Sequence, residues 1–320
     1  MHVRRLALGL LLLVFIAAPT AASHENDPQW MMSGTWSAGR DPHGDQWWIG
    51  LRTEHVGGVH EMGWTFDSQS IEGLDPKALG GDRVPVDFKI RRDAGSILAH
   101  GVFSGTKGGG TFELELDPAF ARALESRGVG RPTKAQHARL LLGDANLSFL
   151  DTLAREKYAT PRVDMLVKMN DHGVREAFVT GLAKAGYRLE SLDALVRAVD
   201  HGVNAQFVQE MAVLGFRDLD FETLMRARDH GVTADYVADL EEIGFQGLSL
   251  EQTIRARDHG VDGVYVQSLW SAGFKGLTLE DAIRARDHGV TSGDARRMRE
   301  KRPDASLSDV IAWRDRGMEP

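Results

Sequence analysis

Five aspartate–histidine pairs are the residues of this chain whose types and spacing could do chemistry. Each pair opens the sequence Asp-His-Gly-Val, and each copy follows the one before it by 29 residues. Histidine next to a carboxylate can serve metal binding or general acid–base catalysis. The copies contain Asp171, His172, Gly173, Asp200, His201, Gly202, Asp229, His230, Gly231, Asp258, His259, Gly260, Asp287, His288 and Gly289.

The spacing argues against one shared metal centre. A fixed period of this length is typical of stacked helical units, whose neighbouring helices lie about 8–10 Å apart. The ligands of one metal ion converge within about 2.0–2.2 Å of it, so histidines one unit apart do not share an ion. We therefore expect a structural motif with each histidine at a helix end, and a functional histidine ladder is the alternative. Each aspartate is expected to bond the next turn or an arginine such as Arg228, Arg257 or Arg286.

Helices with recognisable ends must position these pairs. Ser249 and Gln252 form a capping box for one helix, which Gly260 ends because glycine readily adopts a left-handed conformation. A second helix begins at Asp262 and ends at Gly273. Equivalent caps recur at Ser191, Asp220, Thr278 and Ser306 for the first helix, and at Asn204, Thr233 and Thr291 for the second.

The same register extends towards the N-terminus. Stepping back 58 residues from Ser191 and Asn204 reaches Thr133 and Asn146, which also suit helix caps. We therefore predict an α-solenoid of two-helix repeats over residues 133–320, with six units and a final half-unit.

Arginines recur on these helices with the same period, at Arg197, Arg226, Arg255 and Arg284 and again at Arg228, Arg257 and Arg286. Stacked units would align them in stripes that could recognise carboxylates or phosphates. The alternative is that nearby acidic residues neutralise them, namely Glu222, Glu251, Glu280 and Asp281.

Residues 30–117 change to a period of two and hold five of the seven tryptophans. This pattern predicts five or six antiparallel strands in a small β-sandwich or barrel, so the chain as a whole is an α+β multidomain protein. The sequence Val56-Gly57-Gly58-Val59 suits a two-residue hairpin turn, which places Leu51 opposite Trp64. A helix within residues 118–130 links this β domain to the helical array.

Trp48 follows a core-facing tryptophan, so it should point to the opposite face of the sheet. An exposed tryptophan with Arg52 nearby could stack on a sugar ring or on a side chain of a partner. The alternative is that the linking helix or the array covers it.

Metal sites are not expected in the β domain either. The predicted hairpin places His55 opposite His60, which supplies only half of a metal site. The segment Asp41-Pro42-His43-Gly44-Asp45 suits a polar loop, with weak calcium binding as the alternative. We therefore predict no metal and no cofactor.

Residues 1–23 have the layout of a secretory signal peptide, with Arg4 and Arg5 before an apolar run that ends near Ala18. The run is short for a membrane span, and an uncleaved anchor is the alternative. Its removal leaves 36 of the 38 basic residues against 46 acidic ones. The net charge of such a chain is negative, so it does not attract nucleic acid or anionic lipid. We expect an exported protein, periplasmic or secreted, without stable membrane insertion.

The chain contains no cysteine. An exported protein of this composition forms no disulfides, carries no thiol nucleophile and offers no cysteine for a lipoprotein anchor.

The phrase Arg-Ala-Arg-Asp-His-Gly-Val occupies residues 226–232, 255–261 and 284–290. These repeats resemble those of a class of uncharacterised exported bacterial proteins. They are also similar to repeats appended to some sensor metallopeptidases of the BlaR1/MecR1 type. The peptidase signature His-Glu-x-x-His is absent from this sequence. The resemblance therefore implies a role in envelope sensing or protein interaction rather than in proteolysis.

The sequence carries no Gly-x-Ser-x-Gly elbow and no phosphate-binding glycine loop before a helix. We predict a non-enzymatic interaction scaffold of the cell envelope, with the helical array as a protein-binding surface. One alternative is a glycan- or cell-wall-binding module that uses Trp48. Another is a hydrolase with a site at the junction of the two domains.

Overall fold

The computed structural model describes residues 32–40, 47–55, 58–66, 71–74, 82–217 and 219–317. The chain divides into two compact units. The β unit comprises Met1–Ser126 and Gly130–Ala145, and the helical unit comprises Arg127–Val129 and Asn146–Pro320. The predicted signal peptide and the polar loop from Asp41 to Asp45 lie outside the described residues.

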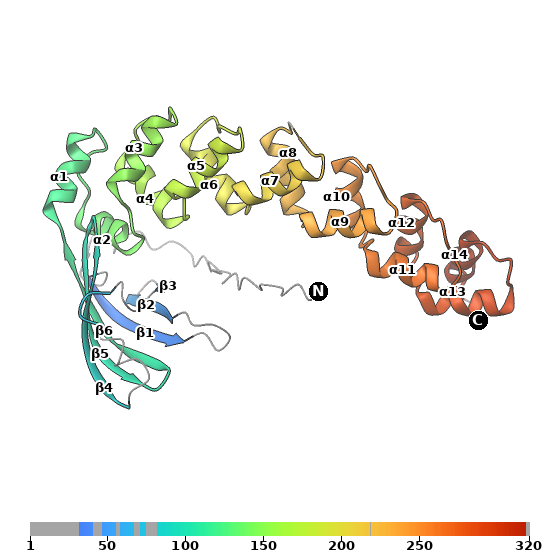
Figure 1. Cartoon of the computed structure of the whole chain (residues 1–320), viewed down its shortest axis with the longest axis horizontal. Helices are drawn as coiled ribbons and strands as arrows, with labels where there is room; N and C mark the ends of the chain where they lie inside the picture. Colours follow the sequence, from blue (N-terminus) through green and yellow to red (C-terminus); the bar gives the residue numbers. More distant parts are fainter. Residues whose placement is uncertain are drawn as a thin grey trace. The chain divides into compact units, whose positions relative to one another are not determined.

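The β unit contains one six-stranded antiparallel sheet, which confirms the prediction of antiparallel β-structure. Its strand order is β3-β2-β1-β6-β5-β4, so β3 and β4 are the edges of an open sheet (Figure 1). The strands are β1 (Ser33–Arg40), β2 (Trp47–His55), β3 (Gly58–Phe66), β4 (Val84–Arg92), β5 (Gly95–Ser104) and β6 (Lys107–Leu116).

The sheet curls around an aromatic core on its inner face. The ring of Trp36 on β1 lies 5.1 Å from that of Phe88 on β4 and 5.5 Å from that of Phe103 on β5. These strands are not neighbours in the sheet, so only strong curvature brings the rings together. At the edges, the guanidinium of Arg92 on β4 lies 4.5 Å above the ring of Trp64 on β3.

The register of the β2–β3 hairpin differs from the prediction by two residues. The predicted pairs Leu51–Trp64 and His55–His60 are both wrong. The observed pairs are Ile49–Trp64, Leu51–Met62, Thr53–His60 and His55–Gly58. Because side chains alternate with a period of two, a slip of two residues leaves the apolar side chains on the same face of the sheet.

Two helices belong to the β unit, α1 (Pro118–Ser126) and α2 (Lys134–Leu142). The capping box predicted at Thr133 and Gln136 is present at the start of α2. Nε2 of His137 on α2 lies 2.9 Å from the carbonyl oxygen of Ala94 in the β4–β5 turn. Burial lowers the pKa of His137, although the bond to this carbonyl opposes the shift. The helix that the repeat register predicts as the first of the array is thus grouped with the sheet.

The helical unit holds the remaining helices in two layers. The odd-numbered helices from α3 to α13 pack in chain order, and among the even-numbered helices α4 packs against α6 and α12 against α14. Their bounds are α3 (Leu147–Arg155), α4 (Val163–Asp171), α5 (Glu176–Lys184), α6 (Leu192–Asp200), α7 (Ala205–Val213), α8 (Phe221–Asp229), α9 (Ala234–Glu242), α10 (Leu250–Asp258), α11 (Gly263–Ser271), α12 (Leu279–Asp287), α13 (Ser292–Lys301) and α14 (Leu307–Asp315).

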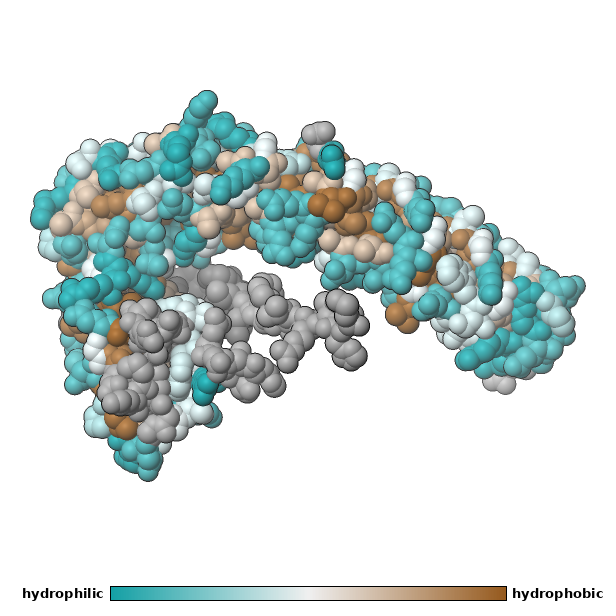
Figure 2. Space-filling model, in the orientation of Figure 1, coloured by the Kyte–Doolittle hydropathy of each residue, from teal (hydrophilic) through white to brown (hydrophobic). Residues whose placement is uncertain are grey.

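The surface of this unit is mostly hydrophilic on the face seen in Figure 2, with apolar residues visible between the charged ones. None of the described helices is both long enough and apolar enough to cross a membrane.

The predicted helix ends are confirmed. Side chains cap the even helices at Ser191, Asp220, Ser249, Thr278 and Ser306. They cap the odd helices at Asn146, Asn204, Thr233, Asp262 and Thr291. After α9, the amide of Phe245 donates to the carbonyl oxygen of Leu240 at 2.9 Å, which closes a Schellman turn. Because these signals are local in sequence, they fix where each helix begins and ends.

Candidate functional site

Within the helical unit, each motif histidine contacts the aspartate of the following repeat unit, by which we mean one 29-residue period of the sequence. Nδ1 of His230 lies 2.6 Å from Oδ1 of Asp258. The same contact, at 2.6–2.7 Å, joins His172 to Asp200, His201 to Asp229, His259 to Asp287 and His288 to Asp315. We call this series the histidine–aspartate ladder. For Asp200, Asp229, Asp258 and Asp287, the predicted partners, the next turn or an arginine, are therefore wrong.

The ladder fixes the proton position on each ring. An ionised carboxylate only accepts hydrogen bonds, so Nδ1 carries the proton and Nε2 is an acceptor in the neutral ring. All five rings are partly exposed. Across the described ranges, no three histidine, aspartate or glutamate side chains meet as a metal site. Each pair therefore stands alone, as a joint between two units.

The first arginine of the motif pairs with a glutamate of the following unit, as one of the two sequence hypotheses stated. Nη2 of Arg197 lies 2.8 Å from Oε2 of Glu222. Arg226 pairs in the same way with Glu251, and Arg255 with Glu280. We call this the arginine–glutamate ladder. Water and salt screen such exposed pairs, so each contributes little to the stability of the fold. Arg284 is exposed, and its side chain makes no ion pair with the residues that the structure describes.

The second arginine of the motif stacks on an aromatic ring of the preceding unit. The guanidinium of Arg257 lies 4.9 Å from the ring centre of Tyr236. The hydroxyl of Tyr236 donates to the carbonyl oxygen of Val261 at 2.6 Å, which adds a second bond between the same units. Equivalent stacks, which complete an arginine–aromatic ladder, join Arg228 to Phe207 at 5.2 Å and Arg286 to Tyr265 at 4.6 Å.

The last unit replaces the stack with an ion pair. Asp294 occupies the position of the aromatic residue and is almost fully buried, with its side chain 1% exposed. Nη1 of Arg314 lies 3.4 Å from Oδ2 of Asp294. Burial alone would raise the pKa of Asp294, but hydrogen bonds from Thr291 and the nearby arginines outweigh it, so the pKa is lowered. This position keeps its role in joining units while its chemistry changes.

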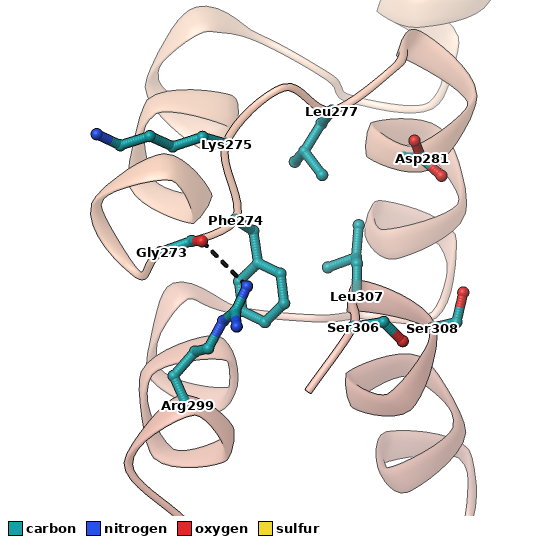
Figure 3. Close-up of a pocket in the computed structure, with 9 residues that line it drawn as sticks. All are labelled: Gly273, Phe274, Lys275, Leu277, Asp281, Arg299, Ser306, Leu307 and Ser308. Atoms are coloured by element: carbon teal, nitrogen blue, oxygen red, sulfur yellow. Dashed lines mark hydrogen bonds between the residues drawn. The ribbon is translucent and has the colours of Figure 1, made fainter. Parts of the chain in front are cut away.

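A hollow of about 440 Å³ lies beside the start of α14 (Figure 3). Phe274, Leu277 and Leu307 lie at its centre. Arg299 stacks on Phe274 at 4.4 Å and donates to the carbonyl oxygen of Gly273 at 3.1 Å. The residues around the rim are Lys275, Asp281, Ser306 and Ser308. No histidine lines this hollow to activate a serine. The guanidinium of Arg299 is engaged by Phe274 and by the carbonyl oxygen of Gly273.

Trp48 and Arg52 lie on the outer face of the sheet, where alternation predicts them. Trp48 is 43% exposed, whereas Trp47 is buried on the inner face. Nη1 of Arg52 lies 3.1 Å from Oε1 of Glu61 on β3. The structure thus brings these two candidates to one face, while the motif arginines lie in the helical unit.

No protein-family profile matches this chain, and neither a curated protein nor a solved structure is detectably similar to it.

Proposed function

We propose that this chain is an exported, non-enzymatic scaffold whose helical unit is an α-solenoid that binds a protein partner. One observation supports the proposal above all. The residues that repeat join each unit to the next, whereas the exposed residues of the odd helices do not repeat.

Three positions on each odd helix are three and seven residues apart, so they lie on one side of the helix. In α7, α9 and α11 all three positions are exposed. We call these residues the odd-helix face: Gln206, Gln209 and Val213 on α7, Asp235, Ala238 and Glu242 on α9, and Val264, Gln267 and Ser271 on α11. Val213 and Val264 are 82% and 80% exposed.

The chemistry of the odd-helix face favours a folded protein as its partner. A regular polymer offers the same groups at every step, so a surface that binds one along its length would repeat with it. The odd-helix face is instead neutral on α7, acidic on α9 and neutral again on α11, and its valine occupies a different position on α7 than on α11. A protein partner would cover Val213 and Val264 together with the polar residues around them, since protein interfaces combine apolar and polar area.

The signal-peptide pattern of residues 1–23 favours the periplasm, or the outside of the cell, as the place where this partner is met. The resemblance of the repeats to those of sensor metallopeptidases supports a role in envelope sensing. The β unit, which we propose to be a barrel-like module, would then act as a second recognition or capping module. The approach of Arg92 to Trp64 at the two sheet edges supports that shape.

The test is affinity capture from envelope extracts with the full mature chain as bait. The variant carries Val213→Glu together with Val264→Glu, and the matched control carries Ala312→Glu, an exposed alanine of α14 outside the odd-helix face. We expect the wild-type chain and the control to enrich the same protein, and the double variant to lose it. Equal capture by the double variant, or no reproducible partner for the wild type, contradicts the proposal.

A further inference from the structure

The indole of Trp48 lies flat on the sheet. A Cβ atom placed on Gly39, its neighbour on β1, would stand 2.7 Å from Nε1 and 3.1 Å from Cζ2 of this indole. A Cβ atom on Gly50 would stand 3.4 Å from its Cζ3. The ring therefore spans the backbone of Gly39 and reaches Gly50. One face of the ring rests on the strands, and the side chain is still 43% exposed.

A peptide ligand cannot bind at Trp48 by adding a strand to the sheet. Trp48 lies on β2, which is bonded on one side to β1 and on the other to β3. An extended peptide joins a sheet only at an edge with free backbone groups. Any ligand at Trp48 must therefore be recognised by side chains rather than by the backbone.

The side chains around Trp48 offer hydroxyl groups and paired charges. Thr65 lies opposite Trp48 on β3, and Thr35 lies opposite Arg52 on β1. Arg52 is neutralised by Glu61, and further along the same face Asp87 lies 2.6 Å from the ring of His100. An aromatic ring among hydroxyls and balanced charges suits a ligand with apolar faces and many hydroxyl groups, and it does not suit a polyanion.

The residues between Trp48 and Arg52 have small side chains or none, so they do not project from the outer face of the sheet. In register across four strands, this row consists of Gly63, Gly50, Ser37 and Gly109. Inner-face glycines are required by packing, since a Cβ atom on Gly101 would stand 2.6 Å from the ring of Trp36. A Cβ atom on Gly50 or Gly109 has no neighbour nearer than 3.4 Å, which is an ordinary contact. Glycine weakens a strand, so its presence here fits a need for space beside the indole.

We propose that this outer face of the β unit binds a chain of neutral sugar rings, with one ring stacked on Trp48. Trp48 and Arg52 are four residues apart on one strand, or about 13 Å, which exceeds a single ring. At least two linked rings are then needed to reach from the indole to the guanidinium. This activity is separate from the odd-helix face and does not depend on it.

The test is calorimetric titration of the full mature chain with linear β-1,4-linked oligosaccharides of glucose and of N-acetylglucosamine, from one to six rings. We expect saturable binding that strengthens with length, and at least a tenfold loss for Trp48→Ala. Gly109→Thr should unfold at the same or a higher temperature and yet bind more weakly. Glu113→Ala, an exposed change further along the same face, is the control and should bind as the wild type does.

Absence of saturable binding by the wild-type chain to either sugar series overturns the proposal. So does unchanged affinity in Trp48→Ala, or stronger binding to heparin, a polyanion, than to any neutral oligosaccharide. Thermal unfolding of Gly109→Thr separates a blocked surface from a damaged fold. None of these results bears on protein capture by the helical unit.

Discussion

Tyr265 shows how one side chain can join two units. Its hydroxyl donates to the carbonyl oxygen of Val290 at 3.1 Å, and Arg286 stacks on its ring. Both partners belong to the following unit, so the ring is buried where the units meet. This burial raises the pKa of Tyr265 to about 12.

We expect alkaline pH to weaken the helical unit through Tyr265. Its pKa lies above the ordinary value of 10.0. Its contribution to stability is therefore complete below pH 10 and is lost as the pH rises towards 12. Tyr265→Phe should remove part of this pH dependence and cost about 1–2 kcal/mol at neutral pH, because the carbonyl of Val290 loses its donor. Urea unfolding of the wild type and of Tyr265→Phe, at several pH values from neutral to alkaline, measures the free energy of unfolding. Identical pH profiles would contradict the prediction.

The partners of the motif residues could not be read from one unit alone. Adjacent residues such as Asp258 and His259 point in different directions from a helix and do not face each other. Only stacking by one unit brings a histidine to the next aspartate, always 27 or 28 residues further along the chain. That constant separation was the available signal. The ladder starts at His172 because the equivalent position one period earlier is Gly143, which has no side chain to contact an aspartate.

Helices and strands differed in how far the sequence could specify them. Helix ends were predictable because Ser249, Gln252 and Gly260 act on backbone groups within one turn. The β2–β3 register was not, because a slip of two residues keeps Leu51 on the same face. The apolar pattern alone therefore cannot choose between Met62 and Trp64 as its partner.

At the scale of the helix end, Gly244 and Gly260 allow a matched comparison. Both have positive φ, at +89° and +66°, where an alanine costs about 1–2 kcal/mol. A Cβ atom at Gly260 would also stand 3.4 Å from Nε of Arg286, whereas nothing lies within 4 Å at Gly244. Because 3.4 Å is an ordinary contact, the strained backbone is the cause that both sites share, and we expect Gly260→Ala and Gly244→Ala to lower the thermal midpoint by similar amounts. A clearly larger shift for Gly260→Ala would show that the added methyl group disturbs the stack of Arg286 on Tyr265.

Across the whole molecule, the two compact units each have a core of their own. We expect two unfolding transitions. Tryptophan fluorescence should follow the β unit, since five of the seven tryptophans lie in residues 30–117, and far-ultraviolet circular dichroism should follow the helices. Phe112→Ala should lower only the unfolding midpoint of the β unit, and Leu269→Ala only that of the helical unit. Both side chains are fully buried, so each change should cost about 2–5 kcal/mol. Midpoints that move together would show that the units unfold as one.

The three ladders make whole units exchangeable. Because donor and acceptor sit at fixed separations, removing or copying one 29-residue unit in the middle of the series still places each histidine against an aspartate and each stacking arginine against a ring. An insertion of part of a unit within one of these helices would shift donors and acceptors out of register at that joint. Duplication of 29 codons would therefore lengthen the array with contacts that already exist. The copied odd helix could then diverge at its exposed positions without disturbing the joints on either side.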